Sequence, residues 1–289
     1  MSGSPTSSST MPSLVVRMLE AAQIDRGDRV LEIGTGTGYS TSLMCHMLGD
    51  DAVTSIEYDP EVAAAGRMAI NEAGYAPTLV VGDGLTGYDG NAEYDRLIAT
   101  CSVRYIPPHW MWQVRDGGTI TTPLWGWMGA TAFAHLTLDH SGNASGRFLP
   151  DNLYFMTARA HCPHPLAVAL VPRGEPRAST IDPGILDDET GLFVAQLAAP
   201  SAQRLGSGDE VILVDVATGS QAGTKKAGAG GWTVRQHGPL RLWDAVEQAI
   251  QTWQEAGSPH QSGFGLTVGP SGQWVWLGDP DGPRWYLPA

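Results

Sequence analysis

The chain has 289 residues, which is more than a single domain usually contains, so we expect two domains. Its composition, 42% hydrophobic and 16% charged, is typical of a soluble globular protein, and it has no apolar run of the roughly 18 residues that cross a membrane. The lack of such a run argues against a membrane as partner. A formal net charge of −13 repels polyphosphate surfaces, which argues against nucleic-acid binding.

The start of the chain and its cysteines indicate the compartment. Residues 1 to 12 lack the basic start and apolar core of a secretory signal. The three cysteines, Cys45, Cys101 and Cys162, are odd in number and show no CxxC spacing. We therefore predict a protein of the reducing cytoplasm.

Predicted helices and strands alternate through the first half of the chain. Pro12 suits the first turn of a helix whose apolar side chains share one face. The elements expected after it are a strand from residue 30, a helix over 39–48, a strand over 52–57, a helix over 60–71, strands over 78–81 and 94–100, a helix over 108–114 and a strand over 119–124. This alternation predicts an α/β fold with a doubly wound, Rossmann-like parallel sheet, which binds ligands beyond the carboxyl ends of its strands.

The pattern changes after residue 126, and we place a domain boundary near residue 158. The amino-terminal domain, residues 13–157, is expected to end with a strand over 130–138 and a loop over 139–152. Residues 158–289 are predicted to form a smaller α+β domain that helps to hold a peptide. Its expected elements are strands at 166–171 and 210–216, helices over 188–197 and 240–255, a loop at 218–231 and a hairpin over 264–277.

A glycine-rich loop directly follows the first strand. Its order is acid-x-Gly-x-Gly-x-Gly, with Glu32 followed by Gly34, Gly36 and Gly38. Glycines permit a tight turn and a close approach of the backbone to a ligand, and the next helix presents unpaired N–H groups. By itself this pattern fits both dinucleotide-binding proteins and methyltransferases.

Two carboxylates at the ends of the next strands narrow the choice of ligand. Glu57 ends the second strand about 20 residues after the middle glycine, where a carboxylate can accept both ribose hydroxyls. Asp83 follows the third strand, where the adenine amino group is expected, although Gly and Asp are also common turn residues. We infer S-adenosyl-L-methionine as the cofactor. The predicted contacts are Gly34, Thr35, Gly36, Gly38, Glu57, Tyr58, Asp83, Gly84 and Leu85.

The methyl acceptor is expected near the end of the fourth strand, with Thr100 and Ser102 as substrate-binding candidates. No general base is evident there, and none is needed if the acceptor is a carboxylate, which is ionised at neutral pH. Catalysis would then consist of aligning the carboxylate with the methyl group in a desolvated site. Cys101 lacks a paired histidine, so we interpret it as a small packed residue rather than a nucleophile.

Residues 8 to 125 resemble the protein-L-isoaspartate O-methyltransferases, through blocks at 30–38, 54–59, 81–84, 94–95 and 117–123. In that family a Ser-x-Pro segment covers the cofactor and contacts the substrate carboxylate. The matching positions are Thr10, Met11 and Pro12, with Ser8 and Ser9 just upstream. The resemblance implies that residues 1–12 form a lid, that Ser8, Ser9 and Thr10 bind the substrate, and that the Thr10 hydroxyl serves catalysis. Alternatively, residues 8–10 only cap the helix after Pro12.

A narrower resemblance covers residues 98–108 and the tail 264–282. These segments are similar to the methyltransferases that accompany ATP-grasp peptide maturases, which make crosslinked ribosomal peptides called graspetides. The resemblance implies methylation of an aspartyl carboxylate in the crosslinked precursor, followed by closure of the ester to an aspartimide. It also implies the precursor as substrate and the maturase as a partner. Family members carry further residues before the Ser-x-Pro segment, whereas this chain begins almost at it.

Two other functions stay open. One is general protein-L-isoaspartate repair, against which the additional carboxy-terminal domain argues, and the other is a peptide-binding module without turnover. No metal site is expected, because the candidate histidines and cysteine are not a recognised ligand set: His135, His140, His161, Cys162 and His164. The tryptophans at 243, 253, 274, 276 and 285 fit a peptide groove or a core, and their helical and hairpin spacing favours the core.

Overall fold

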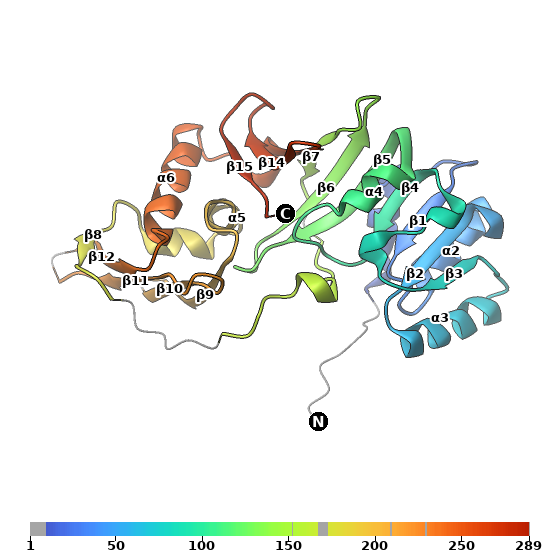
Figure 1. Ribbon diagram of the computed structural model, residues 1–289, viewed down its shortest axis with the longest axis horizontal. Coiled ribbons are helices and arrows are strands. Elements are labelled where there is room, and N and C mark those ends of the chain that lie inside the picture. The colour runs from blue at the N-terminus through green and yellow to red at the C-terminus, as the bar shows by residue number, and fades with distance from the viewer. Residues whose placement is uncertain (1–9, 152, 167–172, 209, 229, 289) are drawn as a thin grey trace.

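The computed structural model describes residues 10–151, 153–166, 173–208, 210–228 and 230–288, which form two sheets at opposite ends of an elongated molecule (Figure 1). The strands of the larger sheet are β1 (Val30–Ile33), β2 (Val53–Glu57), β3 (Thr78–Val81), β4 (Tyr94–Ala99), β5 (Val114–Trp125), β6 (Thr131–Leu138), β7 (Ala144–Leu149), β13 (Phe264–Gly269), β14 (Gly272–Leu277) and β15 (Arg284–Tyr286). Their order across the sheet is β15-β14-β13-β7-β6-β5-β4-β1-β2-β3.

The half of this sheet from β3 to β5 is parallel, and helices alternate with its strands as the sequence predicts. The helices are α1 (Pro12–Ala21), α2 (Tyr39–Leu48), α3 (Pro60–Glu72) and α4 (Pro108–Gln113). The expected Rossmann-like α/β fold is therefore confirmed. Residues of β1 are buried along its whole length, which is typical of a parallel strand covered on both faces.

The register of the parallel strands brings their carboxyl ends to one edge. Ile33, the last residue of β1, pairs with Ile56 of β2 and with Ala99 of β4. Glu57 in turn pairs with Val81 at the end of β3. The segments that follow these strands are therefore neighbours in space, although the sequence separates them widely.

The other half of the sheet is antiparallel and differs from the prediction. We expected a loop over residues 139–152, but β7 lies there, because pairing with β6 and β13 stabilises a stretch whose Ser, Gly and Arg residues favour no strand by themselves. β5 also begins earlier than expected. Its pairing with β4 shifts register between Tyr94 and Arg96, and Gly117 adopts a φ of 72°, so the expected turn is a bulge within the strand.

The carboxy-terminal hairpin forms as predicted but lies in a different place. β13 and β14 pair across the expected turn, and β13 then pairs with β7, with Gly265 opposite Arg147. Residues 264–286, which we assigned to the second domain, thus extend the first sheet. The sequence pattern of a hairpin predicts how its two strands pair with each other, but it does not predict which further strand pairs with the hairpin's edge. The domain boundary near residue 158 stays a prediction.

The smaller sheet is antiparallel, with the order β8-β12-β11-β10-β9. Its strands are β8 (Arg177–Ala178), β9 (Ala202–Ser207), β10 (Glu210–Asp215), β11 (Gln221–Lys226) and β12 (Trp232–His237). The helices α5 (Glu189–Ala198) and α6 (Leu242–Glu255) confirm the two helix predictions of this half. The loop predicted at 218–231 is wrong in part, because β11 occupies residues 221–226. Most of the strand predicted at 166–171 lies outside the described residues.

One apolar core connects the two sheets. Phe193 of α5 lies between two other rings, with centroids 5.5 Å from Phe148 of β7 and 5.6 Å from Phe264 of β13, both edge-on. The interpretation of the tryptophans as core residues is confirmed for Trp243, Trp253 and Trp276, which are buried. Among the described residues, no helix is long and apolar enough to span a membrane.

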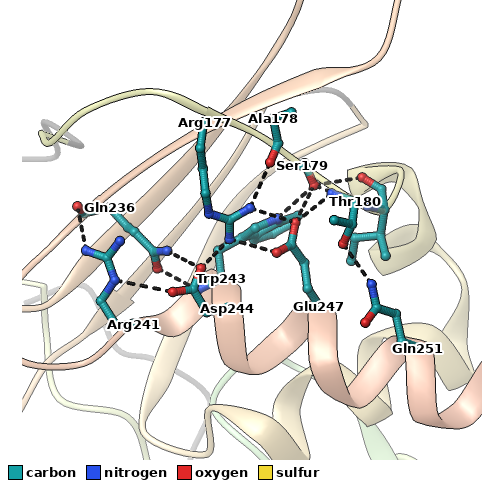
Figure 2. A network of polar contacts seen from close by, with 11 residues as sticks. Arg177, Ala178, Ser179, Thr180, Gln236, Arg241, Trp243, Asp244, Glu247 and Gln251 are labelled. Carbon is teal, nitrogen blue, oxygen red and sulfur yellow. Dashed lines mark hydrogen bonds and ion pairs between the residues drawn. The ribbon is translucent and has the colours of Figure 1, made fainter.

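A partly buried ion-pair network joins β8 to α6 (Figure 2). Arg177 donates to both carboxylate oxygens of Glu247, at 3.1 and 2.7 Å, and it also pairs with Asp244. Glu247 accepts two further hydrogen bonds, from the Ser179 hydroxyl at 2.9 Å and from the Thr180 N–H at 2.8 Å. The Glu247 side chain is only 9% exposed, but the guanidinium of Arg177 balances its negative charge and the four hydrogen bonds satisfy its two oxygens.

Candidate active site

A cavity of about 440 Å³ opens at the carboxyl edge of the parallel strands. This volume falls within the roughly 300–1,000 Å³ of pockets that bind small molecules. It is lined by Thr10, Val15, Ile33, Gly34, Thr35, Gly36, Thr37, Tyr39, Ser40, Ile56, Glu57, Tyr58, Asp83, Gly84, Leu85, Thr100, Cys101 and residues 155–160 and 162. Of the predicted cofactor residues, all except Gly38 line this cavity.

Two positions of the loop require glycine, because each has a positive φ and a close neighbour where a Cβ would lie, and the neighbour differs between them. At Gly34 the backbone has a φ of 102°, and a Cβ would lie 2.7 Å from the Thr100 hydroxyl. At Gly38, which precedes α2 with a φ of 80°, a Cβ would lie 2.6 Å from Cγ1 of Ile70. The predicted cofactor contact of Gly38 is therefore absent from the described cavity. That glycine instead lets the loop pack against α3.

Glu32 holds the loop from behind rather than facing the ligand. It is fully buried and accepts hydrogen bonds from the hydroxyls of Ser40, Thr41 and Ser55, the last at 2.6 Å. Burial raises the pKa of this carboxyl, and the three hydroxyl donors oppose that rise. The acid of the motif thus links β1, β2 and α2 beneath the cavity floor.

The two carboxylates predicted for the cofactor both reach the cavity. Glu57 accepts the Gly36 N–H at 2.9 Å and the Asp59 N–H at 3.0 Å, so backbone groups on both sides fix its orientation. Asp83 uses one oxygen to accept the Leu85 N–H at 3.0 Å. Within the described residues, no hydrogen bond engages its other oxygen, which is free to accept from a ligand. Glu57 is the last residue of β2 and Asp83 follows shortly after β3, so the two carboxylates lie on neighbouring strands of the same edge.

Of the residues predicted to bind the substrate, some line the cavity and one does not. Thr10 and Thr100 line the cavity, and Thr100 donates its hydroxyl to the carbonyls of Ile33 and Gly34, at 3.0 and 2.5 Å. Ser102 is fully buried outside the lining, and its hydroxyl donates to the Phe155 carbonyl at 2.9 Å. Its predicted substrate contact does not fit this position, because a buried backbone acceptor already holds the hydroxyl.

The lid segment is described only from Thr10 onward, and the predicted roles of Ser8 and Ser9 fall outside the described residues. Met11, rather than Thr10, is the N-cap of α1, and no side chain in the described part of the chain caps this helix. The capping alternative therefore does not apply to Thr10, which faces the cavity instead.

Cys101 also lines the cavity, which the sequence did not predict. Burial, together with the negative charges of Glu57 and Asp83, raises the pKa of its thiol to about 12. The thiol therefore stays protonated at neutral pH, as expected for a residue that is not a nucleophile.

Residues 155–162 form a wall of the cavity that sequence reasoning missed. They come after β7 and supply Phe155, Met156 and Arg159 to the lining. Arg159 donates to Asp59 at 2.8 Å and lies 5.0 Å from the centroid of the Tyr58 ring. Their sequence is that of an ordinary connection, and the one available signal was an arginine two residues before His161.

The histidines considered for a metal lie in different environments. His135 bonds to Thr121 at 2.9 Å, and His140 pairs with Asp116 at 2.8 Å. His161 is buried and accepts the Arg104 N–H at 3.1 Å, and burial lowers the pKa of its ring to about 4. Across the described ranges, no group of three potential metal ligands occurs.

The order β3-β2-β1-β4-β5, with a glycine loop after β1 and carboxylates after β2 and β3, defines the fold of S-adenosylmethionine-dependent methyltransferases. Residues 1–141 match the model of the family described as protein-L-isoaspartate(D-aspartate) O-methyltransferase. Over this amino-terminal part, the chain is therefore similar to that family.

Individual relatives show the same similarity. The protein-L-isoaspartate O-methyltransferase of Ignicoccus hospitalis is 39% identical over 115 residues, which are 39% of this chain and 54% of the relative. That of Thermotoga maritima is 33% identical over 124 residues, 42% of this chain and 39% of the relative. The chain thus spans about half the length of the curated relatives it matches, or less.

One solved structure is similar over nearly the whole chain. A protein-L-isoaspartate O-methyltransferase superposes with a TM-score of 0.60 and covers 96% of this chain and 84% of its own. Because the sequences are only 18% identical, this likeness concerns the fold alone.

Proposed function

We propose that this protein transfers a methyl group from S-adenosyl-L-methionine to an aspartyl-type carboxylate in a peptide. One observation carries the proposal: the described cavity lining contains no histidine or lysine, and its other candidate bases are already assigned. The carboxylates of Glu57 and Asp83 are taken by the cofactor in this proposal, the Cys101 thiol is held protonated, and the Cys162 thiol donates toward the carbonyls of the wall. Without a general base, the acceptor has to arrive already ionised. A carboxylate with a pKa of about 4 meets that condition at neutral pH.

The residues present fit the cofactor. Glu57 and the free oxygen of Asp83 offer acceptors for ribose hydroxyls and the adenine amino group, and the backbone of Gly34 and Gly36 lines the cavity beside them. The bound cofactor would supply an electrophilic methyl group, whose bond to sulfur breaks as the carboxylate oxygen forms the new bond to carbon. The products are then a neutral ester and a thioether.

The chain's own part is to orient the carboxylate and to exclude water. Thr10 is placed to donate its hydroxyl to one carboxylate oxygen, which leaves the other oxygen to react. Thr100 is engaged with the glycine loop and fixes the shape of the floor. The apolar side chains of Val15, Phe155 and Met156 limit the water that would solvate the nucleophile.

The finer proposal is that the substrate is a crosslinked ribosomal peptide of the graspetide type, whose methylated aspartate closes to an aspartimide as the next backbone nitrogen displaces methanol. The sequence resemblance supports it. Charge supports it as well, since a chain of net charge −13 with Glu57 and Asp83 in its cavity repels a free acidic peptide. Crosslinks neutralise such acids as esters or amides. An ATP-grasp maturase would then be the partner that supplies the substrate.

General isoaspartyl methylation is the second candidate, and the comparisons favour it. The additional carboxy-terminal part no longer argues against it, because a structure that bears the name of that enzyme is similar over 96% of this chain. Similarity of fold at 18% sequence identity does not show that the two proteins share a substrate.

Mass spectrometry distinguishes the candidates. The protein and S-adenosyl-L-methionine are incubated together with one peptide in each of three separate reactions. The three peptides are the crosslinked precursor, its linear form and an isoaspartyl peptide. We expect gain of one methyl group and then loss of methanol with the crosslinked precursor only. Methylation of the isoaspartyl peptide alone would establish the general enzyme. Calorimetric binding of a peptide without methyl transfer to any of them would instead establish a binding module.

A further inference from the structure

Residues 155–162 cross the carboxyl edge of the parallel sheet, and all of them except His161 line the cavity. They belong to no strand of either sheet. The position of this wall over a bound ligand therefore depends on its attachments to the loops around the cavity, which differ on its two sides.

The attachment next to β4 consists of buried hydrogen bonds. The Ser102 N–H donates to the Met156 carbonyl and the Ala158 N–H donates to the Ser102 carbonyl, both at 2.9 Å. The Ser102 hydroxyl adds a bond to the Phe155 carbonyl. Such main-chain pairing in a buried place is lost only when the local structure unfolds.

The segment is also held at His161, whose ring accepts the Arg104 N–H at 3.1 Å and whose carbonyl accepts from the Trp127 side chain at 2.9 Å. Between these buried attachments, the one next to β2 consists of a single side chain. The Arg159 guanidinium donates to Oδ2 of Asp59 at 2.8 Å, and it lies 5.0 Å from the centroid of the Tyr58 ring. The other oxygen of Asp59 accepts the N–H groups of Glu61 and Val62 and caps α3. Tyr58 directly follows Glu57, so this contact sits beside the proposed ribose site.

We propose that Arg159 is a positioning residue for the cofactor, because its contacts with Asp59 and Tyr58 hold the wall of residues 155–162 closed over the adenosyl end of the cavity. The inference rests on the proposed function, since it takes the ligand to be S-adenosyl-L-methionine. The Arg159 side chain is 46% exposed, so its ion pair is weaker than the buried bonds at Ser102. The short part of the wall that carries Arg159, between the buried attachments at Ala158 and His161, is therefore the part that opens, and this opening governs release of the cofactor.

The test measures binding of S-adenosyl-L-homocysteine by calorimetry and its release by stopped-flow fluorescence. Arg159→Met should weaken binding about three- to tenfold, through faster release, as expected for loss of an exposed ion pair and a cation–π contact. Asp59→Asn keeps an oxygen for the α3 cap and should give a similar loss. The double variant should add little to either single change, since both remove the same contact. Arg159→Lys should recover part of the affinity.

Arg115→Met is the matched control. The Arg115–Asp95 pair has side chains 45% and 17% exposed, against 46% and 19% for Arg159–Asp59, and lies outside the cavity lining. It should leave affinity and release unchanged. The inference is overturned if Arg159→Met and Asp59→Asn bind within twofold of the wild type, or if the Arg115 variant weakens binding equally. Failure of the wild-type protein to bind S-adenosyl-L-homocysteine would instead refute the proposed function, and the inference with it.

Discussion

Removing Arg177 tests whether the network between β8 and α6 stabilises the carboxy-terminal part of the protein. In Arg177→Met, Glu247 loses both guanidinium hydrogen bonds, while those from Ser179 and Thr180 remain. Breaking a fully buried pair costs about 3–5 kcal/mol and an exposed one about 0–1 kcal/mol. Since the Arg177 and Glu247 side chains are 34% and 9% exposed, we expect an intermediate cost of about 2–3 kcal/mol.

Thermal unfolding followed by calorimetry measures this cost, which corresponds to a melting temperature lower by about 4–10 °C in a protein of this size. Arg241→Met is the control, because the Arg241–Asp244 pair is exposed and should change stability by less than about 1 kcal/mol. Adding Glu247→Gln to Arg177→Met should restore part of the stability, since it removes the uncompensated charge. Two results would refute this reasoning: a melting temperature of the double variant no higher than that of Arg177→Met, or a melting temperature of Arg177→Met equal to that of the wild type.

The same network predicts a dependence on pH. Burial by itself would raise the pKa of Glu247, but the hydrogen bonds from Arg177, Thr180 and Ser179 outweigh it and hold that pKa below its ordinary value. A lowered pKa contributes stability above the unfolded-state value of about 4.3, and this contribution is lost as the pH falls through the folded-state pKa. The difference in melting temperature between wild type and Arg177→Met should therefore shrink as the pH falls below about 4.3.

Three further predictions concern the cavity. Glu57→Gln should weaken S-adenosyl-L-homocysteine binding about 10- to 100-fold in calorimetry, through loss of charge-assisted hydrogen bonds, and an unchanged affinity would remove Glu57 from the site. Thr10→Ala should lower the rate of methyl transfer several-fold, by the order of one hydrogen bond, while cofactor affinity stays near that of the wild type, and unaltered turnover would contradict its role. Gly38→Ala should destabilise the fold by about 1–3 kcal/mol in urea unfolding, because its Cβ meets Ile70, and Gly49→Ala, which has a positive φ but open space, should cost less.

Much of the amino-terminal half is determined locally and was predictable from the sequence. The apolar run into Gly34 and Gly36, the capped start of α3 at Asp59 and the acids that end β2 and lie just past β3 each specify their own structure by short-range chemistry. Because parallel strands meet at one edge, their order along the chain was enough to bring Glu57 and Asp83 to the same cavity. The family resemblance added Thr10, which lines that cavity.

Tertiary structure alone decided the remaining features. β7 exists because strands on both sides complete its hydrogen bonds, and the hairpin of β13 and β14 reaches β7 from more than a hundred residues away. The wall that carries Arg159 has no local signal, since its contacts to Asp59 and Ser102 join segments that only the folded sheet brings together. Periodicity and turn chemistry report interactions between near neighbours in the sequence, whereas strand partners and cavity walls depend on which distant surfaces the fold places in contact.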